Sequence, residues 1–246
     1  MPFLPIHLLR SGASELGIEL FRDQLDQLDE FASLLVEANR RFNLTRITDP
    51  GEIVINHYLD SLLCLWALDL QPGARIIDVG TGAGFPGLPI KIARPDLALT
   101  LLDSTSKKIA FLSEAVRALG LDNVEPVHAR AEQLSHQKSH RERFDTVYAR
   151  ALADLRVLAE LCLPFVHVGG RVVAPKSDDI DEEIAAARPI IGQLGGEIEK
   201  TVRTHIPGTD IARRIVVIVK TRQTPSGFPR PYSRIASKKQ ADSSAA

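Results

Sequence analysis

The chain has 246 residues, of which 44% are hydrophobic and 25% are charged, and its formal net charge is −1. This composition is typical of a globular protein and argues against a disordered or membrane-embedded one. The near-zero charge also argues against a protein that coats nucleic acid with its whole surface, although it allows a local basic patch. The length suits one α/β core with a modest accessory segment.

Two features indicate a cytoplasmic protein. The apolar N-terminus, residues 1–9, has no basic segment ahead of it and does not resemble a secretory signal. Cys64 and Cys162, the two cysteines of the chain, each lie within an apolar helical pattern. Such cysteines are typical of buried thiols in a reducing compartment, so we expect neither a disulfide nor a metal site.

Residues 1–70 are expected to form a helical segment that packs on the core. Between residues 20 and 38, apolar residues recur at the spacing that places them on one face of a helix. A second helix through about Leu68 is predicted by Asp49-Pro50-Gly51-Glu52, which supplies an N-cap, a proline at the first helical position and an acidic residue at the third.

From residue 71 onward, short apolar strands alternate with helices. This alternation predicts right-handed βαβ units around a parallel sheet. The predicted strands are residues 75–79, 97–102, 124–127, 144–148 and 170–174, and the predicted helices are residues 87–93, 107–119, 155–165 and 181–194.

Two further strand-like runs, residues 197–204 and 211–221, are separated only by residues 205–210. This connection is too short for a crossover helix, so the two strands must pair antiparallel. A mostly parallel sheet that ends in an antiparallel hairpin resembles the class I methyltransferase fold, with residues 71–222 as its Rossmann-like domain. Nicotinamide dehydrogenases usually continue with another parallel strand instead.

The most specific stretch runs from the first predicted strand into a glycine-rich turn and then a helix. Glycines let the backbone turn sharply and approach a ligand, and free N–H groups at a helix start can face a polar group. Gly82, Gly84 and Gly87 also match the spacing of a dinucleotide-binding loop, which leaves a nicotinamide-dependent oxidoreductase as an alternative. The stretch reads Ile76-Ile77-Asp78-Val79-Gly80-Thr81-Gly82-Ala83-Gly84-Phe85-Pro86-Gly87.

Asp78 shifts the balance toward S-adenosylmethionine. It lies two residues before Gly80, as in the methyltransferase motif whose acid helps orient the loop around the methionine part of the cofactor. Asp103 ends the second strand, where it can accept hydrogen bonds from both ribose hydroxyls; an N-cap for the helix that begins near Ser106 is a structural role compatible with this one. Ala131 and Glu132 follow the third strand, where a backbone amide and an acid can bind the adenine edge, or where a surface helix simply begins.

The end of the fourth strand lies where the acceptor of such an enzyme meets the methyl group. The sequence there, Tyr148-Ala149-Arg150-Ala151, lacks the Asp/Asn-Pro-Pro-aromatic cluster common in methylation of exocyclic amines. Methylation of pyrimidine C5 needs a cysteine nucleophile, whereas Cys162 fits a core position better. A guanine N7 carries a lone pair and no proton, so its methylation needs no general base and relies on alignment and electrostatics.

Three blocks of residues together resemble the ribosomal RNA small subunit methyltransferase G family, over about residues 42–220. The resemblance implies transfer of a methyl group from S-adenosylmethionine to N7 of a guanine in a decoding-region loop of 16S rRNA. It also implies cofactor contacts from Gly80, Phe85, Ala131, Glu132 and Arg150. The blocks are Phe42-Asn43-Leu44-Thr45 with His57-Tyr58-Leu59-Asp60-Ser61-Leu62, the glycine block from Asp78 to Pro89, and Arg130-Ala131-Glu132 with Tyr148-Ala149-Arg150-Ala151.

Four residues are candidates for catalysis. Arg150 ends the fourth strand, and His57 and Asp60 lie three apart on one face of the second predicted helix. An alternative is that His57 and Asp60 only tie this helix to the glycine loop. Lys176 follows the fifth strand, where the family usually has a Lys-Gly pair; Ser177 departs from that pattern. Lys176 is a candidate contact to a phosphate or the base, and a solvated loop lysine is its alternative.

The C-terminal segment, residues 223–246, is predicted to be a basic, flexible tail. Between residues 211 and 239 the chain carries eight basic residues and no acidic one, so this stretch is a candidate contact to RNA phosphates or a solvated tail. We expect 16S rRNA or an assembling small subunit as the partner, and a monomer. A non-catalytic ribosome-assembly factor is a third alternative. The basic residues are Arg213, Arg214, Lys220, Arg222, Arg230, Arg234, Lys238 and Lys239.

Overall fold

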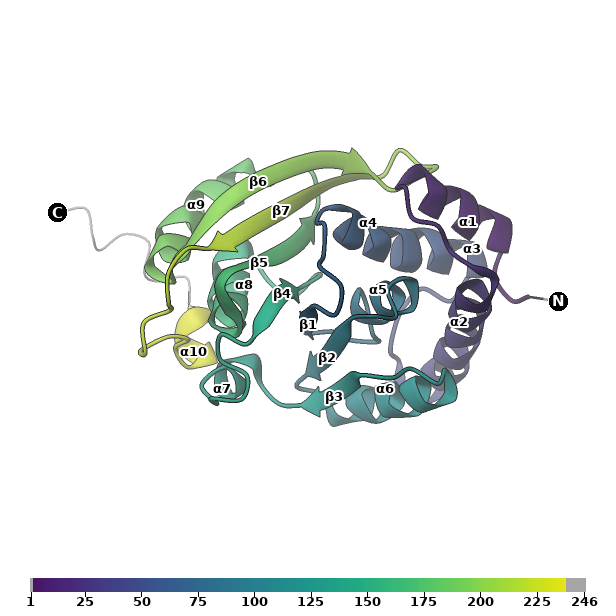
Figure 1. Ribbon diagram of the computed structural model, residues 1–246, viewed down its shortest axis with the longest axis horizontal. Helices are drawn as coiled ribbons and strands as arrows, with labels where there is room; N and C mark the ends of the chain where they lie inside the picture. The colour runs from purple at the N-terminus through teal and green to yellow at the C-terminus, as the bar shows by residue number, and fades with distance from the viewer. Residues whose placement is uncertain (1, 238–246) are drawn as a thin grey trace.

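The computed structural model describes residues 2–237, in which a seven-stranded sheet lies between two layers of helices (Figure 1). The strand order is β3-β2-β1-β4-β5-β7-β6. The pairs from β3 to β5 are parallel, whereas β7 pairs antiparallel with both β5 and β6. The predicted fold, a mostly parallel sheet with a final antiparallel hairpin, is therefore confirmed. The strands are β1 (Arg75–Val79), β2 (Ala98–Asp103), β3 (Val124–His128), β4 (Phe144–Tyr148), β5 (Val166–Lys176), β6 (Gly196–His205) and β7 (Ala212–Lys220).

Each face of the sheet has its own hydrophobic cluster, because successive side chains of a strand point to opposite faces. On β1, Ile76 packs with the N-terminal helices and Ile77 packs with the helices of the other layer. The first layer contains α1 (Ile6–Glu15), α2 (Arg22–Phe42), α5 (Gly87–Ala93) and α6 (Ser106–Ala118); the second contains α8 (Leu155–Cys162) and α9 (Asp181–Gln193). The N-terminal helices thus share their core with the sheet.

The second predicted helix is divided into three consecutive segments. They are α3 (Pro50–Ile53), the π-helix η1 (Val54–Leu59) and α4 (Asp60–Trp66). The Asp49 carboxylate accepts a hydrogen bond from the Glu52 N–H at 3.0 Å, as the N-cap prediction requires. The π-helix was not predicted, since an apolar spacing of three to four residues does not distinguish a local π segment from an α-helix.

Some further elements differ from the prediction. β5 begins at Val166 and not at residue 170; Gly169 and Gly170 interrupt the apolar run, and the strand is irregular there, with φ +94° at Gly169 and a shift in its register with β4. The short helix α10 (Tyr232–Ile235) was not predicted.

The C-terminal segment packs on the core as far as Ile235, which differs from the predicted flexible tail. Arg141 donates hydrogen bonds to the carbonyls of Phe228 at 2.9 Å and Thr224 at 2.8 Å. Arg230 forms an ion pair with Glu160, whose side chain is buried. The rest of the predicted tail, including Lys238 and Lys239, lies outside the described residues.

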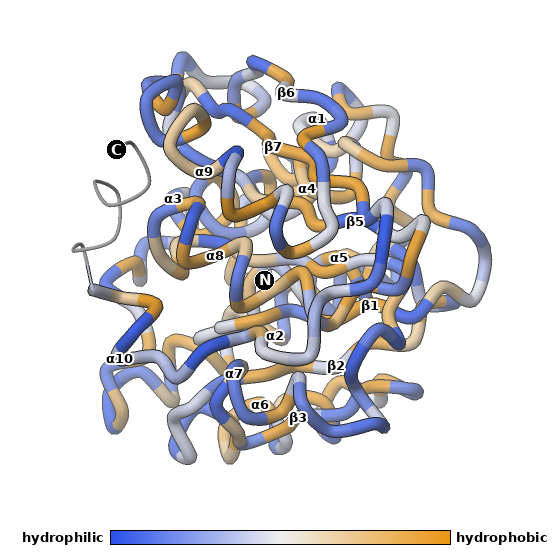
Figure 2. Tube along the Cα trace, turned by 90° about the vertical axis from the view of Figure 1, so that its left-hand side faces the viewer, coloured by the Kyte–Doolittle hydropathy of each residue, from blue (hydrophilic) through white to orange (hydrophobic). Residues whose placement is uncertain are grey.

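Hydrophobic residues run along inner elements such as β7 and α5, and the outer loops are mostly hydrophilic (Figure 2). Within residues 2–237, every helix is too short or too polar to cross a membrane.

Candidate active site

Two cavities open at the carboxyl ends of β1 and β4, where the strand order reverses. Open α/β sheets bind their ligands at this point. The β2 cavity, of about 340 Å³, is lined by the ends of β1, β2 and β3. The β4 cavity, of about 610 Å³, is lined by η1, the glycine turn, the ends of β4 and β5 and the start of β7. Gly80, Lys108 and Ala151 line both cavities, so the two are adjacent.

The glycines of the turn have different functions. Gly80 has φ +73°, and a Cβ there would lie 2.5 Å from Leu152 Cδ1, in the wall of the β2 cavity. At Gly82, φ is +61° and the space around a Cβ is open, so its backbone is accessible from the β4 cavity. Gly84 lines neither cavity: a Cβ there would lie 2.8 Å from Leu88 Cδ1. Gly80 and Gly82 therefore line the cavities, and Gly84 allows close packing.

Asp78 fixes the glycine turn through hydrogen bonds on the side away from the cavities. Its side chain is fully buried, and Oδ2 accepts hydrogen bonds from the Thr81 hydroxyl at 2.6 Å and the Gly87 N–H at 2.8 Å. Burial raises the pKa of Asp78 to about 6, while these two hydrogen bonds act in the opposite direction. Asp78 lines neither cavity. It is placed to fix the conformation of the loop and not to contact a ligand.

The β2 cavity has a buried carboxylate at its floor. Asp103 Oδ2 accepts a hydrogen bond from the Gly82 N–H at 3.0 Å, and Oδ1 accepts one from the Thr105 N–H at 2.8 Å. Lys108 Nζ lies 3.4 Å from Asp103 Oδ2. The N-cap residue of α6 is Thr105, so the expectation that Asp103 is also that N-cap is wrong.

The walls of the β2 cavity suit a nucleoside. Ala131 and Glu132 begin the short helix α7 (Ala131–Leu134) on one side, and Leu152 and Leu161 supply apolar surface. A carboxylate oxygen has two lone pairs, so Asp103 can accept ribose hydroxyls in addition to its backbone partners. The cavity therefore combines a carboxylate that can accept hydrogen bonds from hydroxyl groups with apolar wall surface.

A buried carboxylate joins two arginines at the wall of the β4 cavity. Arg150 Nη1 donates to Asp60 Oδ2 at 2.8 Å and to the Asn56 carbonyl at 2.8 Å. Arg213 Nε, from the start of β7, donates to Asp60 Oδ1 at 2.7 Å. Asp60 is only 4% exposed. Asp60 therefore positions two cations from distant parts of the chain at one cavity wall.

His57 lies between this network and the glycine turn. Its ring stacks on Phe85, with centroids 4.3 Å apart. Arg150 Nη2 lies 3.3 Å from His57 Nδ1, and because arginine only donates, Nδ1 is the acceptor. The proton of the neutral ring is then on Nε2, which donates to Thr45 Oγ1 at 3.0 Å. Burial, followed by the nearby Arg150 charge, lowers the pKa of His57 to about 4. At neutral pH His57 is uncharged and both ring nitrogens are engaged.

This environment predicts a specific pH dependence of stability. The folded-state pKa of His57 lies below the unfolded value of 6.5, so the unfolded chain binds the proton more readily between pH 6.5 and about 4. The contribution of His57 to stability is complete above pH 6.5 and is lost as the pH falls through this window. Between pH 7 and pH 4, we expect the wild type to lose roughly 3 kcal/mol more unfolding free energy than His57→Gln, measured by urea unfolding. Parallel pH profiles would contradict this prediction.

Lys176 is held by the protein and does not extend into solvent. Its Nζ donates to the Ala153 carbonyl and to Glu183 Oε1, both at 2.6 Å, and the residue lines the β4 cavity. The alternative of a solvated loop lysine is therefore wrong. The structure brings Lys176 to the same cavity as His57 and Asp60.

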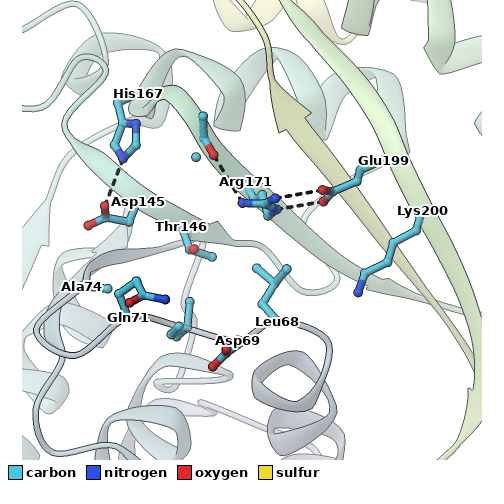
Figure 3. Close-up of a pocket in the computed structure, with 13 residues that line it drawn as sticks. Leu68, Asp69, Gln71, Ala74, Asp145, Thr146, His167, Arg171, Glu199 and Lys200 are labelled. Carbon is cyan, nitrogen blue, oxygen red and sulfur yellow. Dashed lines mark hydrogen bonds and ion pairs between the residues drawn. The ribbon is translucent and has the colours of Figure 1, made fainter.

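A third cavity, of about 510 Å³, lies at the amino ends of the parallel strands, beside the start of β5 (Figure 3). His167 Nε2 lies 3.0 Å from Asp145 Oδ1, and Arg171 makes two hydrogen bonds of 2.8 Å to Glu199. These charged side chains already pair with one another, and the cavity is at the amino ends of the parallel strands. Within residues 2–237, no cluster of three or more His, Cys, Asp or Glu side chains is arranged to hold a metal ion.

Sequence reasoning did not identify several residues of the two cavities. Thr45 belongs to the motif Phe42-Asn43-Leu44-Thr45, but the sequence does not show that its hydroxyl forms a hydrogen bond with His57, which lies on η1. Arg213 was expected to contact RNA phosphates. Its ion pair with Asp60 was missed, because a run of basic residues in the sequence does not show which distant carboxylate pairs with one of them. Leu152 and Tyr232, in the β2 cavity, follow no motif.

The sheet order, the glycine turn at the switch point and the two adjacent cavities define a class I S-adenosylmethionine-dependent methyltransferase. Two solved structures with this fold are similar to the chain. The crystal structure of M. jannaschii TYW2 in complex with AdoMet has a TM-score of 0.51 at 13% identity and covers 65% of this chain and 73% of that one. The crystal structure of TrmN from Thermus thermophilus has a TM-score of 0.50 at 21% identity and covers 65% of this chain and 48% of that one.

Sequence comparison gives the family. The profile of the GidB family, described as rRNA small subunit methyltransferase G, matches residues 24–211. The ribosomal RNA small subunit methyltransferase G of Pelotomaculum thermopropionicum is 45% identical over 222 residues, which cover 90% of this chain and 93% of that protein. The protein of the same name from Desulforamulus reducens is 43% identical over 222 residues, covering 90% and 92%. The chain belongs to the ribosomal RNA small subunit methyltransferase G family.

Proposed function

We propose that this methyltransferase transfers the methyl group of S-adenosylmethionine to N7 of a guanine in 16S rRNA of the small ribosomal subunit. Family membership and the fold support the reaction class and the ribosomal substrate. The residues of the β4 cavity support guanine N7 as the atom that is methylated. With this substrate, the enzyme is expected to act in the cytoplasm, and we expect a monomer.

The β2 cavity and the glycine turn fit the cofactor. We assign the ribose to Asp103, the adenine edge to Ala131 and Glu132, and the methionine part to the backbone of Gly80 and Gly82, next to Phe85 and Arg150. When bound, S-adenosylmethionine supplies a methyl group on a positively charged sulfur. Asp78 and Gly84 support these contacts by fixing and packing the loop.

The observation that carries the acceptor assignment is that the β4 cavity offers no free general base among the described residues that line it. Among residues 2–237, Asp60 is the only carboxylate that lines this cavity, and it is ion-paired to Arg150 and Arg213. Both ring nitrogens of His57 are engaged. Guanine N7 carries no proton, so no group of the protein has to remove one. We therefore propose that His57 and Asp60 position Arg150, and that Arg150, Arg213 and Lys176 bind the target nucleotide.

The cysteines argue against methylation at pyrimidine C5, which requires a thiolate nucleophile. Cys64 and Cys162 are both fully buried, and burial raises the pKa of each thiol. Neither residue lines the β4 cavity. Both thiols are therefore protonated and out of reach of a base in that cavity.

Much of the basic stretch after residue 211 is used inside the protein. Arg214 pairs with Asp178, Lys220 pairs with Glu142, and Arg230 pairs with Glu160. This revises the expectation that the whole stretch contacts RNA phosphates. The cations around the β4 cavity, together with the exposed Arg46 of its rim loop, are better placed for such contacts. RNA affinity should fall as salt concentration rises.

A transfer assay tests the assignment. Purified protein is incubated with methyl-labelled S-adenosylmethionine and small subunits, or 16S rRNA, from cells that lack the enzyme, and the nucleosides are then separated. We expect label in 7-methylguanosine, and none with RNA from cells that contain the enzyme. Label in another nucleoside would refute the guanine N7 assignment. Cofactor binding without transfer to either substrate would favour a binding-only assembly factor.

A further inference from the structure

The C-terminal helix α10 contributes an aromatic side chain to the β2 cavity. Tyr232 lines this cavity together with Ala131 and Glu132 of α7, and Figure 1 shows α10 beside α7 and α8. Tyr232 is 42% exposed, a large fraction for an aromatic residue. It comes from a part of the chain more than ten residues beyond the last strand. An exposed aromatic side chain at the rim of a cavity suggests a contact made only when a ligand is present.

Arg141 fixes the chain that leads to α10. Its Nη1 donates to the Phe228 carbonyl at 2.9 Å, and its Nη2 donates to the carbonyls of Thr224 at 2.8 Å and Pro225 at 3.1 Å. His136 Nε2 lies 3.0 Å from the carbonyl of Pro229. A single guanidinium that satisfies three carbonyls of one segment gives that segment a defined path over the core.

Two anchors bracket Tyr232 itself. Glu160 is 1% exposed and accepts hydrogen bonds from the N–H of Arg230 at 2.8 Å and from its Nη2 at 2.7 Å. On the other side, Ile235 is buried in the cluster formed by α8 and α9. Glu160 lies on α8 directly before Leu161, which lines the β2 cavity. The anchors therefore hold Tyr232 in register with the wall of the cavity.

We propose that Tyr232 forms part of the wall against which the adenine of the cofactor packs, so that the C-terminal segment is a cofactor-binding element. This inference rests on the assignment of the β2 cavity to the adenosine half of S-adenosylmethionine. Among the described residues that line this cavity Tyr232 is the only aromatic one, and the remaining apolar surface comes from small or aliphatic side chains such as Ala131, Leu152 and Leu161. An aromatic ring adds apolar area and a flat surface that a purine can stack on or meet edge to face.

Calorimetry with two ligands tests the proposal without relying on turnover. S-adenosylmethionine and methylthioadenosine share the adenosine part, but only the first carries the amino acid part. Tyr232→Ala should weaken both ligands by the same factor, about tenfold. Tyr232→Phe keeps the ring and should bind both within about twofold of the wild type. Trp66→Ala is the matched control, because Trp66 is 41% exposed and lines neither cavity.

The outcomes distinguish failure of the role of Tyr232 from failure of the assignment of the β2 cavity to adenosine. If the wild type binds both ligands and Tyr232→Ala binds them equally well, the role of Tyr232 is refuted while the cofactor site stands. A loss confined to S-adenosylmethionine would also refute it, since Tyr232 would then act on the methionine half. If the wild type binds neither ligand, the assignment of the β2 cavity fails together with the inference. Thermal unfolding of each variant checks that Tyr232→Ala stays folded.

Discussion

Replacing Gly80 with alanine is expected to weaken S-adenosylmethionine binding about 100-fold, as measured by calorimetry. Gly80 has φ +73°, a conformation that costs an alanine roughly 1–2 kcal/mol. The added Cβ would also lie 2.5 Å from Leu152 Cδ1. Either Leu152 moves or the turn leaves its conformation, and since Gly80 lines both cavities, each response alters the cofactor site.

Gly17→Ala is the matched control for the backbone cost. Gly17 has φ +71°, and a Cβ there would meet no atom within 4 Å. This variant should lose a similar amount of stability and bind the cofactor within about twofold of the wild type. Equal loss of cofactor affinity in both variants would show that general destabilisation, and not the cavity, explains the effect at Gly80.

The sequence allowed most of the sheet to be predicted, because its signals are local. An apolar run followed by a glycine turn and a helix identifies β1 and the turn after Asp78 from a dozen neighbouring residues. The six-residue connection before β7 excludes a crossover helix, which predicted the antiparallel hairpin that the structure confirms. In both cases the constraint is the geometry of a short segment and needs no knowledge of distant contacts.

The β4 cavity was less predictable, because its geometry depends on contacts across the chain. His57 lies in the π-helix η1 and Asp60 begins α4, so their relative orientation differs from the α-helical spacing that was assumed. The partners of Asp60 are 90 and 153 residues away along the chain. The basic stretch failed as a guide for the same reason, since the burial and pairing of Arg214 and Lys220 are tertiary properties.

Replacing Asp60 with asparagine is expected to lower kcat/KM for RNA methylation at least about 100-fold and to cost about 3 kcal/mol of stability. Asp60 is 4% exposed and balances both Arg150 and Arg213, and no other carboxylate lines the β4 cavity in the described chain. Without this charge the two guanidinium groups repel each other in a partly buried site, and Arg150 is free to leave Phe85 and His57. Steady-state kinetics and urea unfolding measure the two effects.

A second substitution distinguishes loss of charge balance from loss of a single contact. Asp60, Arg150 and Arg213 together have a net charge of +1. Asp60→Asn raises this charge to +2, and the double variant that also carries Arg213→Gln returns it to +1. If repulsion between the arginines causes the instability, the double variant should be more stable than Asp60→Asn alone by about 1–2 kcal/mol, although each single substitution destabilises the protein. Additive losses would mean that Asp60 stabilises each arginine independently. Cofactor affinity provides the remaining contrast. Asp60 and Arg213 do not line the β2 cavity, to which we assign the adenosine part, so S-adenosylmethionine binding should fall less than about tenfold while kcat/KM for methylation falls at least about 100-fold.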